Sequence, residues 1–143
     1  MLIGLIALVA TAAFAGAAFY INFAEHPARA ALSSSAAVRQ WAPSYKRGFV
    51  MQSSLAIVGG ICAGLQWYLG GGAAWLFGGL ILLANWPFTL LIIMPVNRRL
   101  LTYEALPEGD VGALLGRWNR LHAVRTALGV AAVAAMLFAA VNP

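Results

Sequence analysis

The chain has 143 residues, of which 62% are hydrophobic and 9% are charged. Ordinary soluble domains carry about 25% charged residues, so this composition excludes that class and indicates a protein embedded in a bilayer. The net charge of +5 does not indicate nucleic-acid binding, because no polar surface remains to present it, and the single cysteine, Cys62, excludes an intrachain disulfide.

The first predicted span covers residues 1–23, which contain no charged side chain. No basic segment precedes this run, and it exceeds the usual hydrophobic core of a signal peptide (about 7–15 residues), so we expect a retained transmembrane helix. Asn22, His26 and Arg29 follow at i, i+4 and i+7, and Glu25 can pair with Arg29 at i+4. Pro27 disfavours helical geometry at His26, so the helix is expected to end or kink there.

A polar connection follows over residues 30–47. Ser33–Ser35 can cap a short helix over Ala36–Trp41, and Pro43 is expected to end it. Trp41 and Tyr45 next to two basic residues are typical of the membrane interface. The sequence therefore predicts a short interfacial helix between the first two spans. A lid over a site is the alternative.

The second and third predicted spans cover residues 48–69 and 73–94, joined by a glycine turn. Gln52 lies about one turn inside the second span, and the Gly60-x3-Gly64 pattern would allow close helix approach. Asn85-Trp86-Pro87 interrupts the third span, where the proline kinks the helix. Asn85 therefore needs a partner in a neighbouring helix or cavity, and a packing role is preferred over ligand contact.

The fourth predicted span covers residues 118–141, with Asp110 a plausible N-cap for its helix. Trp118, His122 and Arg125 are spaced i, i+4 and i+7, so they share one helix face at the start of the span. An ionisable group about one turn inside a membrane boundary normally faces the protein interior. We therefore predict that Arg125 points inward and bonds a group on the first or third helix, with Glu25 or Asn97 the favoured partner.

Alternation of four spans places every Lys, Arg, Asp, Glu and His on one side of the membrane. The positive-inside rule makes that side cytoplasmic and puts both termini outside. The predicted fold is all-α: a single-domain, four-helix transmembrane bundle in the cell membrane, with a polar pocket at its cytoplasmic mouth.

Four segments of the chain resemble a known family, and they are Glu25-His26-Pro27-Ala28-Arg29, Pro43–Gly48, Met94–Leu100 and Trp118-x3-His122-x2-Arg125-Thr126. The sequence is similar to the four-helix membrane family listed as domain of unknown function 1772, which includes the anthrone oxygenase-like proteins. The residues that match the family's core motif are Pro95, Asn97, Trp118, His122 and Arg125. The resemblance implies an integral membrane protein and, for some members, oxidation of an anthrone to an anthraquinone with molecular oxygen.

The residues can be matched to that chemistry. An anthrone loses a proton to give a stabilised carbanion that reacts with oxygen without metal or flavin, so a base, an enolate stabiliser and a flat apolar pocket suffice. We expect His122 to be the base, since its ordinary pKa is near neutrality, with Arg125 and Asn97 as oxyanion stabilisers. Trp118 would stack on a ring. The other predicted substrate-binding residues are His26, Asn22, Glu25 and Gln52.

No dinucleotide fingerprint, P-loop or CxxC motif occurs, so no cofactor is expected. A metal-dependent enzyme using Glu25, His26 and His122 is one alternative. Another is a non-catalytic membrane protein that binds a lipid, quinone or partner helix, with the same residues forming a satisfied polar network. The expected partner is a lipophilic small molecule or lipid within the membrane. A homo-oligomer is compatible with the sequence, which leaves the physiological substrate open.

Overall fold

The computed structural model describes residues 2–142, which form four long helices joined by short connections. Each long helix is apolar enough to cross a membrane, so the chain is a multi-pass, all-α membrane protein, as predicted. The elements in chain order are α1 (Leu2–Tyr20), the π-helix η1 (Ile21–Glu25), α2 (His26–Ala30), α3 (Ser34–Tyr68), α4 (Ala73–Leu83), α5 (Asn85–Phe88), the π-helix η2 (Thr89–Ile93), α6 (Met94–Leu101), the 3-10 helix η3 (Tyr103–Ala105) and α7 (Glu108–Val141).

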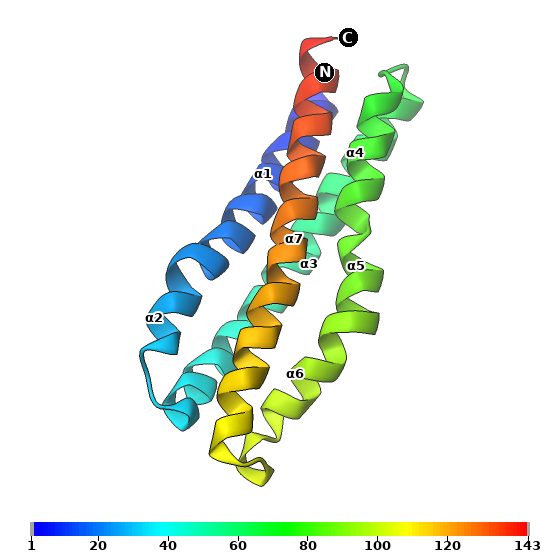
Figure 1. Cartoon of the computed structure of the whole chain (residues 1–143). Coiled ribbons are helices and arrows are strands. Elements are labelled where there is room, and N and C mark those ends of the chain that lie inside the picture. The colour runs from blue at the N-terminus through cyan, green and yellow to red at the C-terminus, as the bar shows by residue number, and fades with distance from the viewer. Residues whose placement is uncertain (1, 143) are drawn as a thin grey trace.

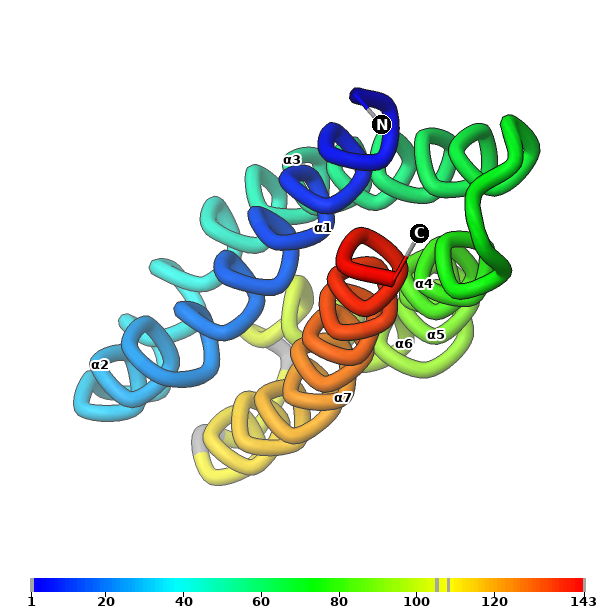
Figure 2. Tube along the Cα trace, turned by 90° about the horizontal axis from the view of Figure 1, so that it is seen from above, coloured from blue at the N-terminus to red at the C-terminus, as the bar shows by residue number. Residues whose placement is uncertain are grey.

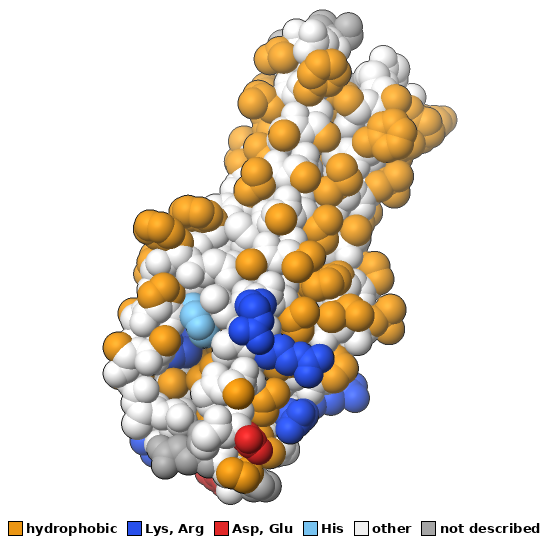
Figure 3. All heavy atoms as spheres, in the orientation of Figure 1, with side chains coloured by type: hydrophobic (Ala, Val, Ile, Leu, Met, Phe, Trp, Pro, Cys, Tyr) orange, Lys and Arg blue, Asp and Glu red, His pale blue; other side chains and the backbone are white. Residues whose placement is uncertain are grey.

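The four long helices close into a ring in which α1 packs against α3 and α7, and α4 packs against the same two helices (Figures 1 and 2). Figure 1 places both chain ends and the α3–α4 turn at one end of the bundle, and the other two connections at the opposite end. On the face drawn in Figure 3, the Lys and Arg side chains gather toward that opposite end, and no charged side chain is seen toward the other end. We call this the charged end and the other the far end.

The helix α3 runs through Pro43 without interruption, so the expected separate interfacial helix is wrong. Pro43 removes only the backbone hydrogen bond that its missing N–H would have made, one bond within a helix of 35 residues. Its own side chain is exposed, whereas Val38 and Trp41 on the other face are buried in the bundle. Tertiary packing of that face therefore outweighs the local cost of the proline.

The first helix also continues past its proline, contrary to the expected end at His26. A π-helical turn precedes Pro27, and the second π-helix precedes Pro95 in the same way. In each case the residue before the proline donates its N–H to the carbonyl five residues back: His26 to Ile21, and Met94 to Thr89. The wider turn relieves the clash between a proline ring and the preceding carbonyl, so both helices stay continuous.

The third helix is interrupted near Pro87, as predicted, at the junction between α4 and α5. Asn85 compensates locally, because its side-chain amide donates to the carbonyl of Leu82 at 3.0 Å. The partner is thus in its own helix rather than in a neighbouring one.

Small residues let the helices approach closely toward the far end. A Cβ added at Gly60 would lie 2.6 Å from Leu83, and one at Gly79 would lie 3.1 Å from the Cβ of Ala63. Gly64, the second glycine of the predicted pattern, has open space around it. The close contact therefore uses Gly60 with Gly79 rather than the Gly60-x3-Gly64 pair.

Candidate functional site

All four long helices contribute side chains to a polar cavity toward the charged end of the bundle, here called the His122 pocket. Its free volume is about 30 Å³, which leaves room for small molecules such as water or dioxygen. The lining residues are Ile21, Glu25, Arg29, Trp41, Ser44, Tyr45, Gly48, Phe49, Gln52, Ile93, Asn97, Trp118, His122 and Arg125.

His122 is buried, and the side chain of Asn22 fixes its tautomer. The Asn22 amide nitrogen donates to the side-chain oxygen of Asn119 at 2.7 Å and to its backbone carbonyl at 3.0 Å. Its Oδ1 therefore faces Nδ1 of His122, at 3.1 Å, and also accepts from the Thr126 hydroxyl at 2.7 Å. An amide oxygen can only accept, so Nδ1 of His122 must carry the proton. The other ring nitrogen, Nε2, is left with a free lone pair.

Aromatic rings form one wall of the pocket. Trp118 stacks on His122 with ring centroids 4.9 Å apart, and Trp41 meets Trp118 edge-on at 5.9 Å. Tyr45 stacks on Trp41 at 4.9 Å. Trp41 is fully buried within the bundle, so its ring faces other helices and not lipid headgroups. Its spacing of four and eleven residues from Tyr45 and Gln52 places all three on one helix face, a signal hidden by the assumption that Pro43 ends the helix.

Arg125 points into the bundle, as predicted, and only 9% of it is exposed. Its partner is Gln52 on α3, whose Oε1 accepts from Nη2 at 2.6 Å. The predicted partners, Glu25 and Asn97, are wrong. The guanidinium also lies over the ring of Phe14, 5.5 Å from its centroid. A charged donor bonded to an amide and covered by a ring is thus buried without a carboxylate.

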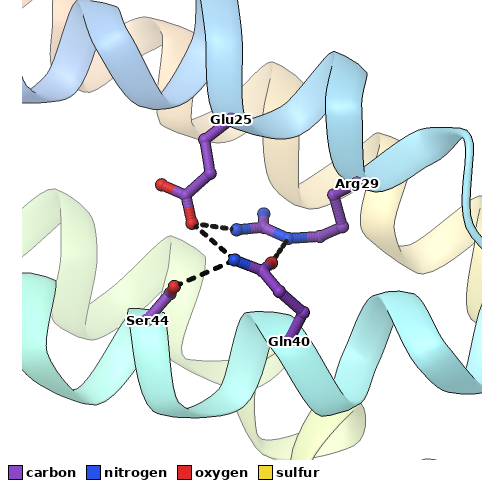
Figure 4. Close-up of polar contacts among 4 residues, drawn as sticks. All are labelled: Glu25, Arg29, Gln40 and Ser44. Atoms are coloured by element: carbon purple, nitrogen blue, oxygen red, sulfur yellow. Dashed lines mark hydrogen bonds and ion pairs between the residues drawn. The ribbon is translucent and has the colours of Figure 1, made fainter.

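Glu25 is held instead by its own helix and by α3 (Figure 4). Its Oε1 accepts from Nη2 of Arg29, which confirms the predicted pair, and from Gln40. Gln40 in turn accepts from Nε of Arg29 and donates to Ser44. Arg29 is buried and lies over Trp118, 5.8 Å from the ring centroid. The sequence analysis found the Glu25–Arg29 pair but missed Gln40 and Ser44, which tie α2 to α3 at the mouth of the pocket.

Several polar atoms on the pocket lining have no hydrogen-bond partner among the described residues. They are both amide atoms of Asn97, Nε1 of Trp41, Nη1 of Arg29, Nε2 of Gln52 and Nε of Arg125. Buried polar groups are normally paired, so atoms left over around one cavity mark positions where ligand atoms would bind. Donors predominate, which favours a ligand that carries oxygen acceptors.

Six of the eight predicted site residues line the pocket, and they are Glu25, Gln52, Asn97, Trp118, His122 and Arg125. Asn22 stands behind His122 and orients it. His26 lines a separate cavity between α2 and the start of α7. Within the described part of the chain, no three His, Cys, Asp or Glu side chains come close enough to hold a metal ion, so Glu25, His26 and His122 form no ligand set.

The comparisons with known proteins bear on this geometry. A family model described as anthrone oxygenase matches residues 41–135. Neither the curated proteins nor the solved structures include a match to the chain. The matched segment begins at Trp41 and contains Asn97, Trp118, His122 and Arg125, so it holds most of the pocket. On this match, which confirms the resemblance of the motifs, the chain belongs to the anthrone oxygenase family.

Proposed function

We propose that this protein is a membrane-embedded oxygenase that oxidises a lipophilic, anthrone-like aromatic substrate with O2 and uses His122 as the base. The observation that carries the proposal is the hydrogen bond from Nδ1 of His122 to Asn22, which leaves Nε2 as a proton acceptor. Family membership supports the reaction class. We propose that the reaction needs no metal or organic cofactor, because the substrate itself supplies the electrons.

The atoms and electrons of this reaction balance with the substrate, O2 and the imidazole of His122. Nε2 of His122 removes a proton from the ring CH2 opposite the carbonyl, and the electron pair delocalises onto the carbonyl oxygen as an enolate. The enolate passes electrons to O2, and a carbon–oxygen bond forms at the former CH2. The resulting peroxide takes a proton back from the imidazolium and then loses water to give the second carbonyl. One oxygen atom of O2 enters the quinone and the other leaves as water.

The surrounding residues act on charge and position. Arg125 and Asn97 stabilise the enolate oxygen in a site shielded from water, where such contacts are strongest. Trp118 stacks against the ring system. The free volume of about 30 Å³ suits O2, whereas a tricyclic ring needs roughly several hundred Å³. Substrate binding therefore requires Tyr45 and Phe49, which are only half-buried, to move aside.

Oxygen uptake and quinone formation by protein purified in detergent test this proposal. We expect His122→Ala to lower turnover by about 10²- to 10⁴-fold, the usual contribution of a general base. His26→Ala is the matched control, since it removes the other histidine, which lies beside Trp118 but does not line the His122 pocket, and it should keep its rate. Equal turnover by the wild type and a folded His122→Ala variant would overturn the proposal.

The non-catalytic alternative is favoured by the same unpartnered donors, which suit the carbonyl oxygens of a quinone as well as an enolate. It predicts saturable binding of an anthraquinone with no oxygen uptake from any anthrone tested. Turnover by the wild type would reject it.

We also propose that the charged end faces the cytoplasm of a cell whose plasma membrane holds the protein. The support is the positive-inside rule. In a Cys62→Ser background, Gly72→Cys at the far end should react with an impermeant thiol reagent in intact cells, since an added side chain has room there. Ser33→Cys, at an exposed site between α2 and α3, should react only after permeabilisation. The reverse pattern would overturn the orientation and leave the bundle unchanged.

A further inference from the structure

The separate cavity that His26 lines lies between α2 and the starts of α3 and α7, and we call it the His26 cavity. Its free volume is about 220 Å³, far more than that of the His122 pocket. Gly112 and Gly116 on α7 contribute to its wall and leave this space open. A Cβ added at Gly112 would lie 3.9 Å from Oγ of Ser34, so Gly112 faces the start of α3. None of the reaction steps described above uses this cavity.

Arg29 brings an unpaired nitrogen to the wall of the His26 cavity, although only 2% of the residue is exposed. Its Nη2 is bonded to Glu25 and its Nε to Gln40, whereas Nη1 has no partner among the described residues. Figure 4 shows Nη1 on the side of the guanidinium that faces away from Gln40. Nδ1 of His26 is also buried and unpaired. Leaving such groups unpaired is costly, so they point to a ligand that carries acceptors.

The start of α3 adds further donors to the same cavity. Ser34, which lines the cavity, is the first residue of this long helix, and the first N–H groups of a helix have no partner within it. The preceding Ser33 makes no side-chain capping bond to them, and the first turn contains no acidic residue. The positive end of the helix dipole is therefore left open to an anion. Arg120 adds positive charge, since a Cβ at Gly116 would lie 3.9 Å from its Nη1.

These groups match an anion that has several oxygen acceptors, and phosphate is the anion that a membrane supplies. The charged end lies at the level of the lipid headgroups, because charged side chains avoid the hydrocarbon. Basic pockets between transmembrane helices are known to hold phospholipid headgroups. Leu115, which is buried, and Leu32, which is 47% exposed, give the cavity an apolar side as well. A phosphate attached to an acyl chain fits both sides.

We propose that the His26 cavity binds the phosphate group of an anionic membrane phospholipid. Arg29, His26 and the first N–H groups of α3 contact the phosphate oxygens, and the leucines contact the adjoining chain. The bound lipid joins α2 to α3 and α7. This site goes beyond the proposed function, since binding there involves neither His122 nor the substrate.

Three additives separate the phosphate from the rest of the lipid. They are dioleoyl phosphatidic acid, dioleoylglycerol, which has the same chains without phosphate, and inorganic phosphate, which has no chains. The readout is the thermal unfolding midpoint of protein in a non-ionic detergent, measured against additive concentration. Phosphatidic acid should raise the midpoint saturably by several degrees, because it binds the folded state, and equal concentrations of the other two should not.

Each of the other results contradicts one part of the proposal. No rise with phosphatidic acid would overturn the site altogether. An equal rise with dioleoylglycerol would overturn recognition of the phosphate. An equal rise with inorganic phosphate would overturn the lipid as its source.

Two variants locate the binding. Arg29→Gln removes the charge and should raise the apparent dissociation constant of phosphatidic acid at least about tenfold, the effect of one hydrogen bond to a charged group. Gly112→Leu keeps every charge, places a side chain in the cavity and should weaken binding by a similar factor. The matched controls, which should bind as the wild type does, are Arg98→Gln, at an exposed arginine of α6, and Gly109→Leu, where an added Cβ on α7 meets nothing within 4 Å.

Equal binding by Gly112→Leu and Gly109→Leu, or by Arg29→Gln and Arg98→Gln, would show that phosphatidic acid binds elsewhere on the charged end and would overturn the site. If Arg29→Gln does not fold, the pair of glycine variants decides the question, because both keep the bonds between Arg29, Glu25 and Gln40.

Discussion

The two ends of the bundle are built from the same four helices but differ in their packing and in the pairing of their polar groups. Toward the far end, small side chains close the interfaces, and the polar groups are paired: Thr11 bonds the Ala7 carbonyl and lies against Met136, and Gln66 accepts from the backbone N–H of Gly4. From the middle to the charged end, aromatic and polar side chains line the His122 pocket and the His26 cavity. The described buried polar atoms that lack partners are all found there.

This difference assigns stability to one region and ligand binding to the other. In a bilayer, helices gain little from hydrophobic burial against one another, so close contact of small residues must hold them together. Once the far end is fixed in that way, the rest of the bundle can retain unpaired groups that a ligand pairs with. Functional sites are commonly where local rules of packing and pairing are broken.

The largest effect is expected at Gln52. Gln52→Leu removes the acceptor of a buried guanidinium, and an unpaired buried charge costs about 3 kcal/mol or more. Thermal unfolding in detergent measures this cost. Gln66→Leu at the far end is the control, since it removes one bond to a backbone N–H and should cost only about 1 kcal/mol. Adding Arg125→Leu to Gln52→Leu should recover much of the stability without restoring turnover. Similar midpoints for the two glutamine variants would contradict the proposed contrast between the ends.

A smaller effect, on turnover rather than folding, is expected at Asn22. Asn22→Leu removes the acceptor that holds the proton on Nδ1 of His122, so the ring is free to protonate Nε2 instead. By analogy with other residues that orient a catalytic histidine, the loss should be about 10- to 100-fold in kcat, with KM little changed. Thr126→Val is the control, because it removes a second donor to Asn22 but leaves the acceptor in place. A normal rate in Asn22→Leu would show that the tautomer does not matter.

Hydropathy, charge and helical spacing predicted the spans and the inward direction of Arg125, and together with the family motif they predicted most of the pocket. These features follow from the cost of burying charge in lipid, because the positions of the charged residues can be read directly from the sequence. Six predicted site residues converge because helix alternation brings them to one end, whatever the details of each turn.

The turns themselves were not predictable from a 3.6-residue period. A π-helical turn rotates everything after it by about 100° relative to an uninterrupted helix. Asn22 therefore does not share a face with His26 and Arg29: Asn22 bonds Asn119 on α7, whereas His26 and Arg29, both beyond the π-helical turn, line the cavity between α2 and the start of α7. Pro43 led to the opposite error. Its local effect predicts the end of a helix, whereas tertiary packing keeps α3 continuous through the proline. Predicting the partner of Arg125 requires that continuity, because a continuous α3 places Gln52 on the same helix face as Trp41.

The smallest expected effect concerns two glycines on α3 and tests whether close packing holds the far end together. A Cβ at Gly59 would lie 2.7 Å from a Leu82 methyl and 2.9 Å from the Thr11 hydroxyl, and both neighbours are fully buried. Gly64 has nothing within 4 Å. Replacing glycine by alanine within a helix gains roughly 0.5–1 kcal/mol from reduced chain entropy, whereas overpacking costs about 1–3 kcal/mol.

Gly64→Ala should therefore raise the unfolding midpoint slightly, and Gly59→Ala should lower it by a net cost of about 1–2 kcal/mol. Both variants should turn over substrate at the wild-type rate at temperatures where they stay folded, because neither residue lines the pocket. If the unfolding midpoints of both variants rise, close contact between helices does not limit the stability of the far end. A loss of turnover in folded Gly59→Ala would show instead that the two ends are coupled, since strain introduced at one would then reach His122 through the helices they share.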